Sequence, residues 1–308
     1  MQYNVFTHPR FIAFREKQGY EKIRSGIYLA PFKHHALVSS SAAIRNFVRS
    51  LLPIIYIETD NTTFDIHNEA KKKQVFAIQG STYDSAIAES VRELSAVHEA
   101  GTFIIDLTQP QETLYENFDR SLKKQLNKDT ENKLRVERIE NITRFEEYYR
   151  LLRTFRDSMK FRTPSWEVFR QQWEALHGGE DSNYEVFMVV DSEGTMLAGM
   201  GFVVNPETGA CVEVAAVRGT LQRDLPVMDV LRWGIIQWAQ KQGFTSYDLA
   251  GANPNAPEGS KEEGIFRYKE KWGGSFQSVW HYELYFRNHR WYYPLAYLLL
   301  TWTRFIRK

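Results

Sequence analysis

An acid, two cations, an aromatic ring and a glycine lie close together late in the sequence. A segment typical of a short β-strand, residues 245–249, is followed by an irregular loop and then by a short amphipathic segment. The residues that could do chemistry there are Asp248, Gly251, Arg267, Tyr268 and Lys269. A fixed cation can stabilise a developing negative charge, and a neighbouring acid can orient it. Because active sites of open α/β sheets commonly form at strand ends, this pattern indicates a polar site. The alternative interpretation is a strand followed by an ordinary surface loop and a solvated helix.

Composition limits the class of protein. The chain has 308 residues, of which 43% are hydrophobic and 25% charged, and its formal net charge is +1. Bulk charge therefore gives no attraction to nucleic acid, and an anionic partner must meet a local patch. The single cysteine, Cys211, excludes an intrachain disulfide and favours a reducing compartment. The first residues lack a signal-peptide pattern, and the histidines, including His34 and His35, show no metal-ligand spacing, so we expect a cytoplasmic protein without a metal.

Hydrophobic spacing predicts the elements that position these residues. Helices are expected at residues 10–20, 39–52, 83–98, 145–159, 166–177 and 225–242, with a polar helical stretch at 114–138. Strands are expected at residues 26–32, 54–58, 75–78, 103–107, 186–191, 196–205, 210–217, 245–249 and 279–286. A helix, a glycine and an apolar strand occur in succession twice, about half a chain apart, with Gly101 as the first helix stop. This repetition suggests an internal duplication, with a boundary near residues 108–112.

The order of elements in the second half resembles the GNAT acyltransferase fold. In that fold, the strand before the main helix binds the acyl donor through backbone groups, and its splay from the next strand lets the donor reach an acceptor amine. Here these strands would be residues 210–217 and 245–249. The turn after the first of these strands, residues 218–224, would hold the donor's pyrophosphate at a helix N-terminus. This implies donor binding by Arg218, Gly219 and Arg223. The turn lacks the Gly-rich pattern of members that bind acetyl-CoA, and an ordinary capped helix start is the alternative.

Two motifs indicate a narrower resemblance. Residues 247–251 and 264–273 resemble the Tyr-Asp-Phe/Leu-x-Gly strand end and the Gly-x-x-x-Phe-Lys-x-x-Phe-Gly motif of the Fem family of peptidoglycan-bridge aminoacyltransferases. The likeness covers most of residues 103–286. An aromatic residue, Tyr268, still precedes Lys269, but the long coiled-coil insertion with which some members contact tRNA is missing.

The resemblance implies a mixed α/β fold with two GNAT-like domains in tandem. Residues 1–110 would form a degenerate first copy, and residues 111–290 the acyltransferase domain. The aromatic tail, residues 291–308, would form an amphipathic helix. This helix suits a membrane interface, and packing on the domain or on a second copy is the alternative.

Acyl transfer to an amine needs a neutral amine, a proton acceptor and stabilisation of an oxyanion. We expect Lys269 to be the cation near the scissile carbonyl or donor phosphate, and a solvated helix lysine is the alternative. We expect Asp248 to orient Lys269 or the amine, and an acid that caps the next turn is the alternative. Glu213, in a predicted strand, is the candidate base if it is partly buried; strand alternation also permits an outward-facing residue.

The expected function is transfer of an aminoacyl or acyl group to an amine of an anionic cell-wall or polysaccharide precursor. The donor would be aminoacyl-tRNA or acyl-CoA, with no tightly bound cofactor. The expected substrate-binding residues are Gly251, Arg267, Tyr268 and the basic pair Arg120 and Lys124, and the location would be the cytoplasm or the inner face of its membrane. The alternatives are an acyl-CoA-dependent N-acyltransferase acting on a small or sugar amine, and a non-catalytic membrane-associated binding module of the same fold.

Overall fold

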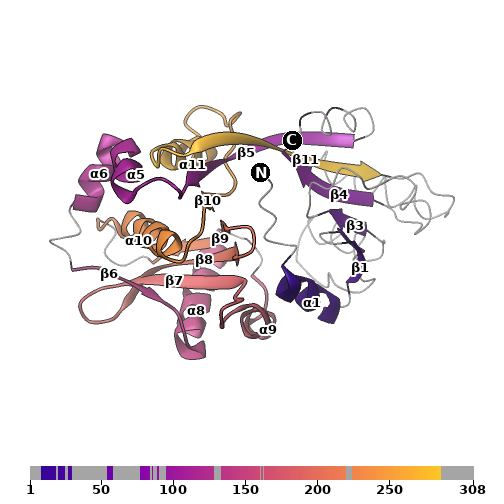
Figure 1. Ribbon diagram of the computed structural model, residues 1–308, viewed down its shortest axis with the longest axis horizontal. Coiled ribbons are helices and arrows are strands. Elements are labelled where there is room, and N and C mark those ends of the chain that lie inside the picture. The colour runs from indigo at the N-terminus through magenta and orange to yellow at the C-terminus, as the bar shows by residue number, and fades with distance from the viewer. Residues whose placement is uncertain are drawn as a thin grey trace. The chain divides into compact units, whose positions relative to one another are not determined.

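The computed structural model divides the chain into two compact units, and neither is one continuous segment (Figure 1). The first is made mainly of residues 3–11 and 100–278, and the second of residues 12–99 and 279–308. The structure describes residues 8–18, 20–24, 27–29, 54–57, 77–83, 85, 89, 95–127, 133–159, 161, 163–219 and 224–285. This division differs from the expected linear boundaries near residues 110 and 290, because two long strands, β5 (Ser95–Asp106) and β11 (Ser275–Tyr285), run from one unit into the other.

The first unit contains a mixed sheet. Its strands follow the order β11, β5, β10, β9, β8, β7, β6. The bounds are β6 (Arg135–Arg138), β7 (Tyr184–Val190), β8 (Met196–Asn205), β9 (Ala210–Arg218) and β10 (Ser246–Asp248). Strands β9 and β10 are parallel, whereas β10 and β5 are antiparallel, as are successive pairs from β6 to β9. All residues of β7 are buried, because helices cover both faces of the sheet at this point.

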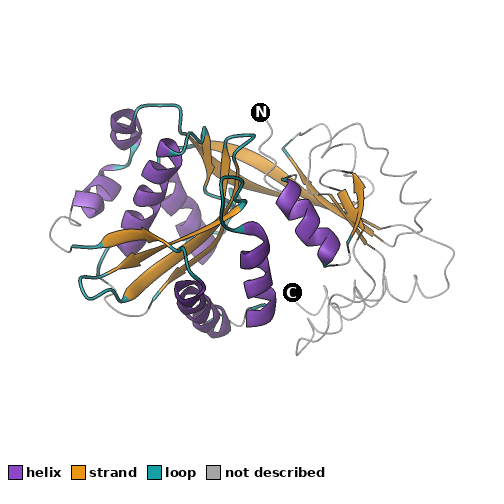
Figure 2. Cartoon of the chain, turned by 60° about the horizontal axis from the view of Figure 1, so that its bottom comes forward, coloured by secondary structure: helices purple, strands orange, loops and turns teal. Residues whose placement is uncertain are grey.

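Six helices of the first unit are described. Two of them, α8 and α10, pack on opposite faces of the sheet (Figure 2). The bounds are α5 (Gln111–Asn117), α6 (Arg120–Asn127), α8 (Ile142–Ser158), α9 (Trp166–Leu176), α10 (Val227–Lys241) and α11 (Lys261–Glu270). Helix α10 buries Leu231 and Ile235 in the main core against Phe202 of β8. Helix α8 starts at Asn141, whose side chain accepts a hydrogen bond from the Arg144 N–H, and it places Tyr148 against the other face.

The second unit has its own strands. Their order is β1, β2, β3, β4, β11, and β3 and β4 form its parallel pair. The bounds are β1 (Glu21–Arg24), β2 (Ile27–Leu29), β3 (Ile54–Ile57) and β4 (Ala77–Thr82), with α1 (Pro9–Lys17) preceding them. The predicted helix at residues 39–52 and the tail 291–308 lie outside the described residues.

Most predicted elements of the second half are confirmed, and two predictions, one on each side of the expected boundary, are wrong in their C-terminal part. The helix expected at residues 83–98 does not reach its predicted end, because β5 begins at Ser95. The helical stretch expected at residues 114–138 contains α5 and α6 but ends in a strand, β6, which pairs with β7. In both places, pairing with strands distant in sequence determined the conformation, and local periodicity could not reveal it.

Gly101 has a different role from the expected helix stop. It lies inside β5, and its N–H and C=O both bond the backbone of Ala252 at 2.6 Å. A Cβ at this position would overlap the ring of Phe276. Gly101 therefore leaves room for the Phe276 side chain of β11, while its backbone hydrogen bonds hold the β10–α11 loop beside β5.

Candidate functional site

Strands β9 and β10 separate at the place where the site begins. β10 pairs with the start of β9, ending at Asp248 opposite Val212. β9 continues to Arg218, whereas the next N–H after β10, that of Leu249, bonds the carbonyl of Phe103 on β5. Beyond Val212, the edge of β9 that faces β10 has no strand partner among the described residues. The expected divergence of these two strands is therefore present.

A β-bulge in β9 lies at the start of this free edge. Glu213 is opposite Phe202 and Ala215 is opposite Gly201, so Val214 is an extra residue in β9. Val214 is 45% exposed, whereas Glu213 is 7% exposed. A bulge bends the strand and redirects its side chains. Here the bulge leaves the Val214 side chain exposed to solvent and the Glu213 carboxylate buried.

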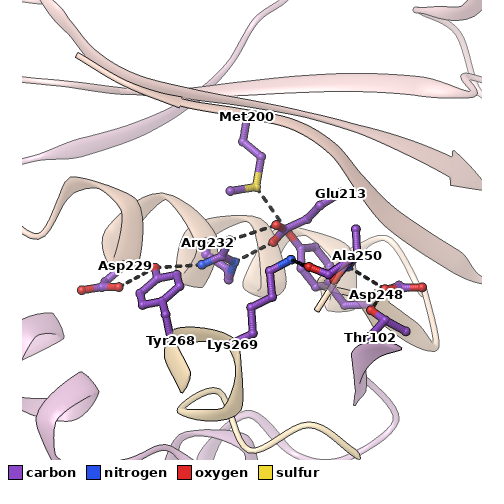
Figure 3. A network of polar contacts seen from close by, with 11 residues as sticks. Thr102, Met200, Glu213, Asp229, Arg232, Asp248, Ala250, Tyr268 and Lys269 are labelled. Carbon is purple, nitrogen blue, oxygen red and sulfur yellow. Dashed lines mark hydrogen bonds and ion pairs between the residues drawn. The ribbon is translucent and has the colours of Figure 1, made fainter. Parts of the chain in front are cut away.

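Glu213 is held by a buried ion pair (Figure 3). Arg232 of α10 binds it with two hydrogen bonds, Nε to Oε1 at 2.6 Å and Nη2 to Oε2 at 2.9 Å. The hydroxyl of Tyr247 on β10 also donates to Glu213 Oε1, at 3.0 Å. Burial by itself would lower the pKa of Arg232, but the Glu213 carboxylate keeps that pKa well above its usual value. The two side chains are therefore charged and fixed relative to each other.

Arg232 also joins α10 to α11. Its Nη1 donates to the hydroxyl of Tyr268 at 2.8 Å, and that hydroxyl donates to Asp229 at 2.7 Å. The guanidinium carbon lies 5.1 Å from the ring centroid of Tyr268 and 5.3 Å from that of Trp272. Burial raises the pKa of Asp229, although the Tyr268 hydrogen bond and the charge of Arg232 act in the opposite direction.

Lys269 and Asp248 hold the same turn from two sides. Lys269 Nζ donates to the carbonyls of Ala250 and Gly251 at 2.8 and 2.7 Å. Asp248 accepts hydrogen bonds from the Ala250 N–H, at 2.6 Å, and from the hydroxyl of Thr102. Ala250 has a φ of 55°, a left-handed conformation that is unusual for a residue with a side chain. These contacts maintain that conformation where β10 ends, which is typical of functional sites.

Burial perturbs both ionisable groups at this turn. Desolvation lowers the pKa of Lys269, and the nearby Glu213 carboxylate partly opposes this shift. Desolvation raises the pKa of Asp248, and the Thr102 and Ala250 hydrogen bonds oppose it. Opposite shifts of a half-buried base and a buried acid that hold the same turn are common at sites that bind charge or move protons.

The structure places the three predicted catalytic residues, Glu213, Asp248 and Lys269, in one polar cluster with Arg232 and Tyr268. It gives Glu213 a different role from the expected one. Both of its oxygens bind Arg232. A carboxylate bound through both oxygens to one buried guanidinium holds that guanidinium in place. The geometry favours Glu213 as a support for Arg232 and Lys269 over its expected role as a base. The expectation of an outward-facing residue is wrong, since Glu213 is buried.

The other predicted site residues are dispersed. Tyr268 belongs to the cluster, and Gly251 contributes a carbonyl to Lys269. Arg267 is exposed and bound to Glu263, with Nε at 2.8 Å from Oε1. Arg120 and Lys124 lie on the exposed face of α6, and neither has a hydrogen bond or ion pair with the cluster in the described part of the chain.

The predicted donor-binding residues lie at the end of β9. Arg218 donates to the carbonyl of Leu225 at 3.0 Å, next to the start of α10. The N–H of Gly219 bonds the carbonyl of Leu197 at 2.8 Å. Arg223 lies outside the described residues. Donor binding at this turn stays a prediction.

Sequence reasoning missed Arg232, Asp229, Tyr247 and Thr102. A signal for Arg232 was present, because its spacing from Met228 and Ile235 places it on the apolar side of α10. Within the described ranges, no group of three or more His, Cys, Asp or Glu side chains could hold a metal ion, and no helix is long and apolar enough to cross a membrane.

Comparisons with known proteins agree with this geometry. The profile of the acetyltransferase (GNAT) domain matches residues 116–270. No curated protein sequence matches the chain. Among solved structures, FemX is similar, with 14% identity, a TM-score of 0.65 and 96% of each chain covered.

Two further structures share the fold. The structure of L-PGS from Bacillus licheniformis has 14% identity, a TM-score of 0.54 and 96% of each chain covered. The C-terminal domain of a putative lysylphosphatidylglycerol synthetase from Agrobacterium fabrum has 13% identity and a TM-score of 0.51, with 86% of this chain and 92% of that chain covered. FemX and the L-PGS structure extend over nearly the whole chain, so the tandem fold expected from the Fem-like motifs is confirmed.

Proposed function

The chain belongs to the acetyltransferase (GNAT) domain family, and on this basis we propose that it transfers an aminoacyl or acyl group to an amine. The observation that carries the proposal is the position of Lys269 beside the free edge of β9. The Glu213 carboxylate, at the first residue past the β9–β10 pairing, interacts electrostatically with Lys269. Backbone groups of that edge are available to an extended donor, and the cation lies where charge would develop.

The chemistry assigned to Lys269 follows from its hydrogen bonds. Two N–H donors of its ammonium bind the carbonyls of Ala250 and Gly251. An ammonium has three donors, so one remains for an oxyanion or a donor phosphate. Because the first two bonds fix the nitrogen, the third donor is oriented before substrate arrives, which is the condition for effective electrostatic stabilisation.

The proposed acceptor is an amine on an anionic cell-wall or polysaccharide precursor. Support comes from the fold shared with FemX and from the basic side chains of α6, Arg120 and Lys124, which are exposed. An acceptor linked to a lipid would place the protein at the inner face of the cytoplasmic membrane, with residues 291–308 as the contact.

An acyl-CoA donor is the second candidate. The sequence favours it because the long coiled-coil insertion with which some Fem members contact tRNA is missing. Among the described residues, the longest helix is α8, with 17 residues. Thermal-shift measurements with CoA and with aminoacyl-tRNA distinguish the two donors, because only a bound donor raises the unfolding temperature.

The test of the function is acylation of candidate amines. The protein is incubated with CoA thioesters or aminoacyl-tRNAs and a set of amine acceptors, and the products are identified by mass spectrometry. Lys269→Met should remove most product while the circular dichroism spectrum is unchanged. Lys241→Met, at an exposed position of α10, serves as the matched control and should keep full turnover. Equal turnover by all three proteins would refute the role of Lys269.

A further inference from the structure

Helix α11 has a small apolar contact with the core, made by Phe266 and by Trp272 just beyond its end. None of its ten side chains is fully buried. Phe266 packs partly against the core, and its ring centroid lies 5.1 Å from that of Phe103. Most helices of globular proteins are held by a buried apolar face. The orientation of α11 therefore depends on its polar contacts as well as on this packing.

Tyr268 makes the polar contacts that join α11 to α10. Its hydroxyl donates to Asp229 and accepts from Arg232, at 2.7 and 2.8 Å. These two partners are three residues apart on α10, so they lie on one face of that helix. The hydroxyl is fixed in two directions at once, and Lys269 is the next residue of α11 (Figure 3).

Arg232 extends the same connection to the sheet. While Nη1 binds Tyr268, Nε and Nη2 bind the two oxygens of Glu213 on β9. Arg232 is 3% exposed, so water does not compete for these donors. The guanidinium of Arg232 therefore connects the free edge of β9, helix α10 and helix α11.

We propose that Arg232, held by Glu213 and joined to α11 through Tyr268, is a positioning residue that fixes the Lys269 ammonium relative to the edge of β9. The kinetic part of this inference rests on the proposed function, whereas the positioning itself is a property of the fold. A displacement of a reacting group by about 1 Å reduces turnover by about a hundredfold. A small rotation of α11 would be sufficient, because the Lys269 side chain is long.

The experiment measures the reactivity of Lys269 directly, without a substrate. The folded protein is treated with trace acetic anhydride at pH 8, and mass spectrometry gives the acetylation of Lys269 relative to exposed Lys124. Tyr268→Phe removes the hydroxyl and retains the ring, and Arg232→Lys retains the charge and removes the fork of donors. In both variants we expect acetylation of Lys269 to change by about fivefold or more, the effect of about one hydrogen bond. Freer access raises the reactivity of the amine, and hydration, which favours the ammonium, lowers it.

Arg138→Lys is the matched control. Arg138 forms a second two-bond pair with a buried carboxylate, Glu185, at 2.8 and 2.8 Å. This pair joins β6 to β7 and includes no residue of α11. We expect this variant to leave Lys269 acetylation unchanged, although it removes the same type of contact. If Arg232→Lys does not fold, Tyr268→Phe decides the outcome.

The outcomes separate this inference from the proposed function. If turnover is found, Tyr268→Phe should lower kcat by about tenfold or more and change KM by less than about twofold, because a misplaced group affects the chemical step. Altered acetylation of Lys269 in the variants, with no turnover by the wild-type protein, would support positioning and reject the function. Equal acetylation in Tyr268→Phe, Arg138→Lys and the wild-type protein would overturn the inference.

Discussion

Glu213→Gln is the most informative single substitution, because it distinguishes a structural ion pair from a catalytic base. The side chains of Glu213 and Arg232 are 7% and 4% exposed. Removing one charge of such a pair leaves the other buried without compensation, which costs about 3–5 kcal/mol. In a domain of about 150–250 residues each kcal/mol shifts Tm by roughly 2–4 °C, so the expected decrease is about 6–20 °C.

Urea unfolding followed by circular dichroism gives the free energy of unfolding for each variant. Glu137→Gln is the matched control, because Glu137 forms an exposed pair with Arg135 at 3.5 Å, and such pairs contribute about 0–1 kcal/mol. The double variant Glu213→Gln with Arg232→Met should recover much of the lost stability, since no unpaired charge remains.

The two roles of Glu213 give opposite results. If Glu213 were a base available to substrate, Glu213→Gln would abolish turnover with little change in stability. If it supports Arg232, stability falls first, and turnover falls with it. A free energy of unfolding equal to that of Glu137→Gln would refute the ion pair as the determinant of this site.

Three further predictions concern other parts of the cluster. Burial lowers the pKa of Lys269 from its usual 10.5, so turnover that needs the charge of Lys269 should begin to decline at a pH below 10.5. Lys269→Arg should move this decline to higher pH. If the decline does not move, it belongs to another group. Gly101→Ala should destabilise the protein by about 1–3 kcal/mol in urea unfolding, because the new Cβ would overlap the ring of Phe276. Gly264→Ala, where an added Cβ meets no atom within 4 Å, should not destabilise the protein. Equal losses of stability in the two variants would contradict this prediction. Tyr247→Phe should cost about 1.5–3 kcal/mol by the same assay, the range for a hydrogen bond to a charged group, and a cost near zero would exclude that bond.

Much of the first unit could be predicted from the sequence, because its signals are local. Helices α8, α9 and α10 and the hairpin of β8 and β9 each follow one clear periodicity over about ten residues or more. The strand-end motif was found for the same reason, since Asp248 and Lys269 lie in short segments with their own pattern. The GNAT-like order of elements then followed from the sequence of predicted elements.

The beginning of β5 shows what local pattern cannot supply. Val97 fits the apolar side of a helix and of a strand equally well, and Gly101 fits a helix stop. The structure places both in β5. Long-range pairing decides between such alternatives, and Gly101 is required by the ring of Phe276, which is distant in sequence. The same dependence makes the two units discontinuous, so no single boundary in the sequence could describe them.

Glu213 and Arg232 indicate how the missed part of the site could be found. Glu213 lies on one face of a strand whose other face carries Val212 and Val214, and Arg232 lies on the apolar side of a long helix. Arg232 conflicts with the apolar pattern around it, because a buried charge persists only with a partner. Glu213 fits strand alternation as an outward-facing residue, and the bulge at Val214 places it inside. A cation on the apolar side of a helix therefore predicts a buried acid on an element that packs against that helix, and here the pair lies where β9 and β10 diverge.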